Sequence, residues 1–462
     1  MLPRCAPGPR LPAPLLVALI ACVLGSPVAA QITAVTTGPA DLVTPPDSTG
    51  DRTLVYGLGF PLQIAPNRAA ILCNVRVEGV PVCDFENGTD AILFGDLAHI
   101  SPGSAVAISR NERRAEGDAA ARLAVKYPLI GGFVPLGALR ADGTPHPHAG
   151  TGFGLCQALS FPTDEKGHFT WADKFVHRCE VYQLSYDGER FQSARSSSGL
   201  EQPYPVAGVW QISAPGITNA IPDGDDLLLP VTATDGTAGR AGVARWARDG
   251  SAWRPVSFSP VTPPGEDWAE PSLVRDSDGA LLFSARGSEG ERLSQVQVWR
   301  RHGDGPQWHL VVSTPDVRVW QKQEQAAQWG LALSLPSAHE PGPISIGCAA
   351  DGTPYIAADQ PGTGRQTLQI RPLNAARMDL DPPLTVRAAR EEFGPAPGGG
   401  AWLVDHPSGA VLRLADGRWH GVLAYRVLGS PEHEGAAPAA QTGCYLEEVL
   451  SSGPVVPPWR FE

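Results

Sequence analysis

The amino-acid sequence predicts an exported all-β protein of two domains, and three observations support this prediction. The chain has 462 residues, which is longer than one ordinary domain. It contains 51 Gly and 46 Pro but only 18% charged residues, a composition typical of many short strands joined by turns. An Asp-Gly turn followed by an apolar strand recurs along the C-terminal part of the chain.

The first element is an expected signal peptide over residues 1–30. Arg4 and Arg10 precede the apolar run LLVALIACVL (15–24), and VAA at 28–30 offers a small-residue cleavage site. This arrangement predicts a secreted or periplasmic protein. The segment LIAC also fits a bacterial lipoprotein box, which would leave a lipid anchor on Cys22 as the alternative contact with a membrane.

The net charge of −12 argues against nucleic acid as a partner and favours a soluble exported protein. Six cysteines remain after cleavage, and an even number in an exported chain predicts disulfides, with buried thiols as the alternative. No Cys/His spacing suggests zinc, so we expect neither a metal nor a cofactor. The expected pairs are Cys73/Cys83, Cys156/Cys179 and Cys348/Cys444.

Residues 31–115 read as short β-segments separated by Gly, Pro and Asn turns. The pieces ITAV, GLGF and SPGSAVAISRN in this region resemble the immunoglobulin-like (IPT/TIG-type) β-sandwich of exported bacterial proteins. The resemblance implies an N-terminal Ig-like β-sandwich domain over 31–115. The charged, Ala-rich stretch that follows predicts a linker over 116–125.

Residues 126–462 contain an internal repeat. Asp-Gly supplies the positive φ angles of a hairpin turn, and an aromatic residue after it can plug the gap between sheets. Spacings of about 55 to 80 residues fit four-stranded blades arranged radially, so we expect a β-propeller of six blades. The first set of turns begins at Asp142, Asp223, Asp278, Asp351 and Asp416, and the interleaved set at Asp187, Asp249 and Asp304.

Two kinds of segment resemble bacterial sialidases. DGSAW and DGPQW are similar to degenerate Asp-boxes (BNR repeats), and WAEPSLVRDSDGALLFSAR (268–286) is similar to the segment in which a Glu precedes a strand, a turn, a second strand and an Arg. Together with PYIAADQPGTGRQTLQI (354–370), the resemblance implies a sialidase-like propeller. It assigns a base-like role to Glu270 and a carboxylate clamp to Arg286 and Arg365, because guanidinium groups bind carboxylates bidentately.

The sequence departs from that family at three points. Val134 in GFVPLGA occupies the place of one clamp Arg. Asp405 and His406 stand where the Tyr nucleophile is expected, whereas Tyr425 and Tyr445 come later, and Tyr425 alternates with apolar residues as a core side chain does. No residue between Leu136 and Phe169 matches the family's acid/base Asp.

Four further residues are candidates for the site. His406 beside Asp405 can act as a general base, since imidazole titrates near neutral pH, although a surface turn explains it equally well. His146 and His148 share a face and can contact substrate, or belong to a plain polar loop. Asn219 precedes an inner strand and can meet sugar hydroxyls.

The leading hypothesis is therefore a carbohydrate-active glycoside hydrolase that acts on or binds glycans bearing an acidic sugar. A non-catalytic propeller that binds glycans or proteins is the competing class, and a polysaccharide lyase with a His or Tyr base is a third possibility. We also expect Arg286 and Arg365 to meet without acidic partners, so that they repel each other unless an anion binds.

Overall fold

The structure is a computed structural model that describes most of the chain. The described residues are 31–36, 47–49, 52–77, 88–98, 100, 104–110, 112–114, 122–162, 176–196, 204–205, 209–262, 264, 268–287, 296–301, 309–314, 343–360, 363–374, 379–396, 400–429 and 441–461. The predicted signal peptide, the lipoprotein box and Cys83 lie outside these ranges.

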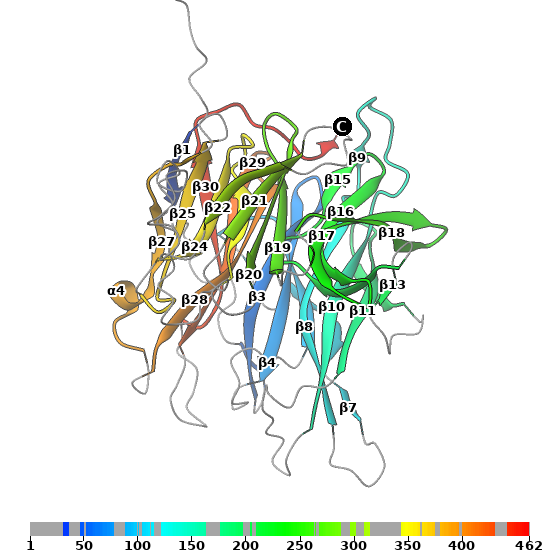
Figure 1. The fold of residues 1–462 in the computed structure, drawn as a ribbon, viewed down its shortest axis with the longest axis horizontal. Helices are drawn as coiled ribbons and strands as arrows, with labels where there is room; N and C mark the ends of the chain where they lie inside the picture. The colour runs from blue at the N-terminus through cyan, green and yellow to red at the C-terminus, as the bar shows by residue number, and fades with distance from the viewer. Residues whose placement is uncertain are drawn as a thin grey trace, which may run out of the picture.

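Strands dominate the described residues and form six sheets of four to six strands, together with one two-stranded pair (Figure 1). Three of the sheets follow one another in the N-terminal half. Their strands are β2 (Asp47–Thr49), β3 (Arg52–Ala65), β4 (Arg68–Val77), β5 (Gly88–Phe94) and β6 (Ala105–Arg110); β7 (Glu112–Arg114), β8 (Arg122–Val134), β10 (Thr151–Pro162), β11 (Val176–Tyr186) and β12 (Phe191–Arg195); and β13 (Tyr204–Pro205), β14 (Gln211–Pro215), β15 (Ile221–Asp223), β16 (Asp226–Thr234), β17 (Gly239–Asp249) and β18 (Ala252–Pro260).

The other three sheets come from the C-terminal half and from the first strand of the chain. Their strands are β19 (Trp268–Arg275), β20 (Leu281–Gly287), β21 (Val296–Arg301) and β22 (His309–Thr314); β23 (Ser345–Cys348), β24 (Pro354–Asp359), β25 (Thr367–Asn374), β26 (Asp379–Leu380) and β27 (Leu384–Ala388); and β28 (Trp402–Arg413), β29 (Trp419–Gly429), β30 (Gly443–Ser451) and β1 (Ile32–Thr36). The two-stranded pair is β9 (Ala138–Leu139) with β31 (Arg460–Phe461), and a short helix, α4 (Ala389–Phe393), follows β27.

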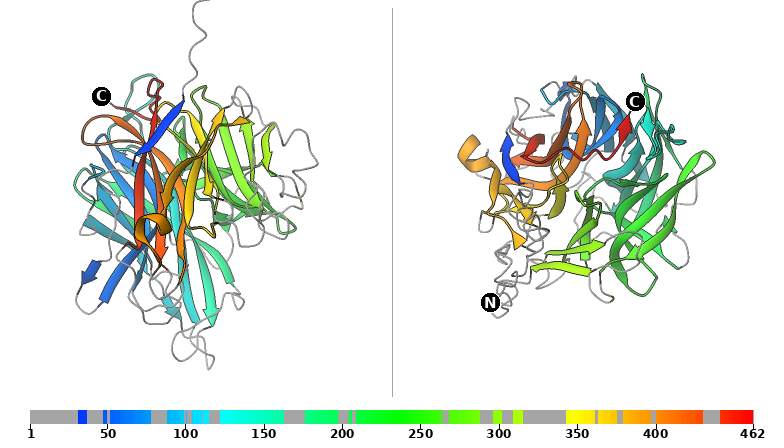
Figure 2. Two further views of the ribbon diagram at one scale, coloured as in Figure 1. Left: turned by 90° about the vertical axis from the view of Figure 1, so that its left-hand side faces the viewer. Right: turned by 90° about the horizontal axis from the view of Figure 1, so that it is seen from above.

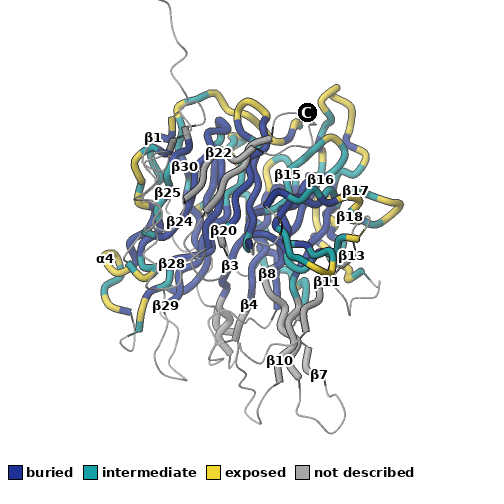
Figure 3. Tube along the Cα trace, viewed as in Figure 1, coloured by how far each residue is buried: buried dark blue, intermediate teal, exposed yellow. Residues whose placement is uncertain are grey.

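The six sheets are arranged around a common centre, as Figure 2 shows in the view from above. One strand of each sheet contacts the neighbouring sheets, and these contacts run in a closed circle through β3, β8, β16, β19, β23, β28 and back to β3. Antiparallel sheets repeated radially in this way make a β-propeller. The trace is mostly buried in the middle of the sheets and exposed at many of the connecting turns (Figure 3).

The N-terminal strand pairs with the last sheet and closes the circle of sheets. β1 pairs antiparallel with β30, so the first and last strands of the propeller lie in one sheet. β2 to β6 form a single sheet, and β3 contacts β8 on one side and β28 on the other. The predicted Ig-like sandwich over 31–115 is therefore not confirmed. Short alternating strands look the same in a sandwich and in a propeller blade, so the sequence pattern alone does not separate the two folds.

Six of the eight predicted Asp-Gly turns join neighbouring strands of a sheet, as the repeat predicts, and the Asp142 turn lies in the connection from β9 to β10. The turns at Asp278, Asp351 and Asp416 join the first two strands of their sheets, and the turn at Asp223 joins the short strand β15 to β16. Glycines 224, 279, 352 and 417 have φ between 67° and 79°. The turns at Asp187 and Asp249 join β11 to β12 and β17 to β18. We call this end of the sheets the turn end. The Asp304 turn lies outside the described residues.

One turn aromatic fills a gap between sheets, as predicted. Trp253 follows the turn at Asp249 and is buried. Its indole Nε1 donates to Thr151 Oγ1 of the neighbouring sheet at 3.2 Å, and its ring lies 6.2 Å from that of Phe153. The contact ties β18 to β10 across the interface.

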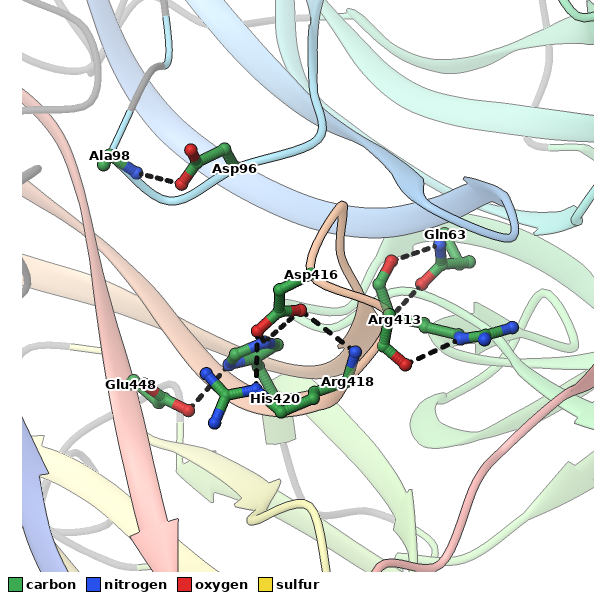
Figure 4. Close-up of polar contacts among 9 residues, drawn as sticks. Gln63, Asp96, Ala98, Arg413, Asp416, Arg418, His420 and Glu448 are labelled. Atoms are coloured by element: carbon green, nitrogen blue, oxygen red, sulfur yellow. Dashed lines mark hydrogen bonds and ion pairs between the residues drawn. The ribbon is translucent and has the colours of Figure 1, made fainter.

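Figure 4 shows how the first sheet of the chain is joined to the last one at the turn end. The Gln63 side chain donates to Arg413 O at 2.8 Å and accepts from Arg413 N at 2.6 Å. Beside this joint, His420 lies between the carboxylates of Glu448, at 2.7 Å, and Asp416, at 3.1 Å. The hydrogen bond to Glu448 is the largest contribution and raises the pKa of His420; burial lowers it, but Asp416 raises it further, so the pKa is raised overall.

The predicted disulfides are wrong where the structure describes both partners. Cys73, Cys156, Cys179, Cys348 and Cys444 are buried thiols. Cys156 lies opposite Glu180 and Cys179 opposite Gln157, and this offset of one residue points the two side chains to opposite faces. Cys348 faces Arg275 O, whereas Cys444 lies against Gly59.

No helix in the described ranges is long and apolar enough to cross a membrane.

Candidate functional site

Two inner strands share a proline bulge near their first residues, at the end opposite the turn end. In β19 the ladder shifts register between Ala269 and Ser272, around Glu270-Pro271. In β28 it shifts between Asp405 and Ser408, around His406-Pro407. Proline has no N–H to donate to a ladder and is tolerated at bulges, and bulges redirect side chains next to functional sites.

Three non-glycine residues of the described chain have left-handed backbones: Glu270 (φ 50°), Arg365 (φ 63°) and His406 (φ 55°). Glu270 and His406 lie in the two bulges, and Arg365 lies in the connection from β24 to β25. Such a conformation costs about 1–3 kcal/mol for a residue with a Cβ, and it tends to cluster at functional sites. All three residues were predicted from the sequence as members of one site.

Glu270 and Arg286 form an ion pair through Arg286 Nε and Glu270 Oε2. Arg286 is close because it lies opposite Ala269 in the β19–β20 ladder. The Glu270 side chain is 23% exposed and that of Arg286 15%, so both reach solvent. The Glu-Pro and the Arg at the two ends of this hairpin are thus brought together by strand pairing.

Asp405 is the centre of a second set of contacts and is fully buried. Its Oδ1 lies 2.9 Å from His406 Nδ1 and 2.9 Å from Arg426 Nε. Its Oδ2 accepts from Arg426 Nη2 at 2.9 Å and from Arg365 Nη1 at 3.4 Å. Burial alone would raise the pKa of Asp405, but Arg426 and His406 hold this pKa far below its usual range. The carboxylate is therefore ionised.

The charges of His406 and Arg365 also act on Glu270, so we group the two sets of contacts as one cluster, which we call the acid–arginine cluster: Glu270, Arg286, Arg365, Asp405, His406 and Arg426. Burial would raise the pKa of Glu270, but Arg286, and then His406 and Arg365, lower it overall. Charges act in this way only at short range. The structure thus brings together Glu270, Arg286, Arg365 and His406, which the sequence grouped.

The expectation that the arginines lack acidic partners is wrong. Arg286 pairs with Glu270, and Arg365 pairs with Asp405. The Arg365 backbone also accepts a hydrogen bond from Val404 N at 2.7 Å, which fixes the β24–β25 connection to β28. The repulsion between the two guanidinium groups is therefore offset within the protein.

The remaining predicted contacts lie elsewhere. A cavity of about 500 Å³ occupies the channel near the turn end, and His146 and Asn219 line it. The Asn219 side chain accepts from Gly131 N at 3.0 Å and donates to Pro61 O at 2.8 Å, so it joins three sheets. The C-terminal segment 456–460 lines the same cavity.

His146 and His148 pack against aromatic rings at the turn end. The His146 ring is 6.2 Å from that of Trp459, and the His148 ring is 5.5 Å from that of Trp253. Burial lowers the pKa of both histidines. In the described ranges no group of three His, Cys, Asp or Glu side chains could hold a metal ion.

The two tyrosines that could supply the nucleophile, Tyr425 and Tyr445, are buried in the protein core. Tyr425 OH donates to Glu447 at 2.7 Å and accepts from Arg387 Nε at 2.9 Å, and its ring stacks on that of Tyr445. Burial raises the pKa of Tyr425 well above its ordinary value. Val134, at the place of the family's third clamp arginine, is also buried.

Arg426 is the member of the cluster that sequence reasoning missed. It lies in the apolar strand WHGVLAYRVLG, and a charged residue inside a buried strand signals a buried partner. That partner is Asp405, which lies directly opposite in the β28–β29 ladder.

No protein-family model matches this chain, and no curated protein matches it. Solved structures do. A protein of unknown function from Dyadobacter fermentans DSM 18053 is 11% identical, with a TM-score of 0.50 over 93% of this chain and 100% of that one. At this identity the likeness concerns the fold alone.

Two enzymes are similar at lower scores. The sialidase of Trypanosoma rangeli in complex with the inhibitor DANA is 10% identical with a TM-score of 0.48, covering 90% of this chain and 58% of that one. The α-L-arabinanase of Penicillium chrysogenum complexed with arabinobiose is 13% identical with a TM-score of 0.44, covering 91% and 98%.

Proposed function

We propose that the protein is an exported, carbohydrate-active six-bladed propeller whose acid–arginine cluster acts on or binds glycans that carry a carboxylate sugar. The observation that carries the proposal is the convergence of three left-handed residues, Glu270, Arg365 and His406, on one charged cluster. Backbone strain at three positions is retained when the geometry it creates has a use.

The charge of the cluster favours an anionic ligand. Its six members contribute three guanidinium groups and two carboxylates, before any proton on His406 is counted. Arg286 and Arg365 are 15% and 20% exposed, so a ligand can reach them from solvent. Guanidinium groups bind a sugar carboxylate with paired hydrogen bonds, which neutral sugars cannot form.

The cluster also holds a proton-transfer pair. His406 is oriented by the buried Asp405 carboxylate, as a general acid or base is oriented by a third group. The pKa of Glu270 is lowered by Arg286, and then by His406 and Arg365, against the effect of burial. In a hydrolytic reaction His406 would give a proton to the leaving glycosidic oxygen, while Glu270 would take one from the attacking water.

Two alternatives rest on specific observations. The Asp405–His406 pair suits a polysaccharide lyase, in which His406 removes the proton beside a uronate carboxylate that the arginines neutralise. The burial of Tyr425 in the core, with no tyrosine among the members of the acid–arginine cluster, instead favours a non-catalytic glycan- or protein-binding propeller.

The test is a screen for the release of acidic sugars from mixed glycans by the full chain and by His406→Gln. Hydrolysis gives saturated products, and elimination gives an unsaturated product that absorbs ultraviolet light. His148→Gln at the turn end is the matched control and should behave as wild type. Release that persists in H406Q would place the chemistry at other residues. If no glycan releases a sugar, the non-catalytic glycan- or protein-binding propeller remains as the function.

A further inference from the structure

We infer that Arg426 is a positioning residue: it fixes the Asp405 carboxylate and thereby decides which ring nitrogen of His406 is left for a substrate. The inference rests on the proposed function, in which His406 transfers a proton. It goes beyond that function because Arg426 itself would touch no substrate.

The geometry leaves Asp405 one orientation. Arg426 lies opposite Asp405 in the ladder and binds both of its oxygens, each at 2.9 Å. The two residues are 2% and 0% exposed. A planar guanidinium that binds both oxygens of a carboxylate fixes its plane, and bulk water cannot replace either contact at this depth.

The fixed carboxylate determines the tautomer of His406. An ionised carboxylate only accepts hydrogen bonds, so the short contact of 2.9 Å between Asp405 Oδ1 and His406 Nδ1 requires a proton on Nδ1. In the neutral ring Nε2 then carries the lone pair. This is the nitrogen that would exchange a proton with a ligand.

Arg426 also keeps Asp405 ionised. The groups that face this carboxylate are Arg426 from β29, Arg365 from the β24–β25 connection and His406 on its own strand. Arg426 makes the largest contribution that lowers the pKa of Asp405 against burial. Without it, burial favours the protonated acid, which can donate to Nδ1 and so leave the proton of the neutral ring on Nε2.

The experiment measures the ring nitrogens of His406 directly. Full-length protein is labelled with ¹⁵N-histidine, and His406→Asn identifies the His406 signals among those of the 11 histidines. Spectra are recorded for wild type, Arg426→Gln and Arg426→Lys at a pH where the ring is neutral. Arg387→Gln is the matched control, since Arg387 is equally buried and pairs with Glu447 at 2.8 Å outside the cluster.

In wild type we expect a protonated Nδ1 and an unprotonated Nε2. R426Q should lose this preference, R426K should largely restore it because it keeps the charge, and R387Q should retain it. A proton on Nε2 in wild type, an unchanged tautomer in folded R426Q, or the same change in R387Q would each overturn the inference.

If R426Q does not fold, the spectra of wild type and R426K still test the inference. R426K is then expected to keep Nδ1 protonated, and loss of that proton in a folded R426K would count against the inference. No sugar is present, so the result does not depend on the proposed function. That function fails separately, if no acidic glycan is bound or cleaved.

Discussion

Closure of the propeller by β1 predicts that one side chain near the N-terminus stabilises the whole molecule. Ile32 is 4% exposed and belongs to a core cluster with Tyr445 and Val449 of β30. Ile32→Ala removes a buried branched side chain and leaves a cavity, which typically costs about 2–5 kcal/mol. β1 also contacts β27 in the next sheet, so the loss affects two sheets.

Scanning calorimetry of the full chain measures this effect. We expect the main unfolding transition to move to lower temperature as a whole, because β1 and β30 unfold together. Val209→Ala is the control, since Val209 is 68% exposed and surface changes usually stay within about ±0.5 kcal/mol. A separate early transition that alone moves in Ile32→Ala would refute the closure and restore an independent N-terminal domain.

Three further predictions concern ionisation, buried polar groups and thiols. The folded-state pKa of His420 is raised by Glu448 and Asp416, so its stabilisation is complete below the unfolded pKa of about 6.5 and fades as pH rises through the folded value. His420→Gln should therefore lower the melting temperature at pH 5.5 more than at pH 9, and equal losses would contradict this. Tyr425→Phe should cost about 1–3 kcal/mol in urea unfolding, because Arg387 and a buried carboxylate lose a hydrogen bond, and an unchanged midpoint would count against that network. Denatured, unreduced protein should show reactive thiols for the five buried cysteines, whereas a near absence of thiols would restore the disulfides.

The sequence predicts the propeller well because its signals are local. Asp-Gly turns need positive φ at glycine, and glycines 224, 279, 352 and 417 have it. The residues that set the boundary of the propeller, in contrast, carry no local sequence signal. Nothing within residues 31–36 indicates that their partner strand lies more than 400 residues away in β30, so the strands of the first sheet read as a sandwich.

The contacts of the candidate site also fall into those that the sequence predicts and those that it does not. Glu270 and Arg286 are joined by a hairpin, and a hairpin can be predicted from its turn. The pairing of Asp405 with Arg426 also lies within one hairpin, but the apolar alternation around Arg426 made it look like core. His146 and Asn219 line the channel at the turn end, and periodicity alone does not tell the two ends of a strand apart.

If Arg286 and its neighbours form a site for an acidic sugar, such a sugar should stabilise the folded protein. The most direct measurement is the shift in melting temperature on adding a carboxylate-bearing sugar, with a matched neutral sugar as the control. We expect a shift for the acidic sugar only. It should be abolished in Arg286→Ala and weakened in Arg286→Lys, because Lys keeps the charge but loses the paired hydrogen bonds. Equal shifts for both sugars, or an unaltered shift in Arg286→Ala, would contradict it.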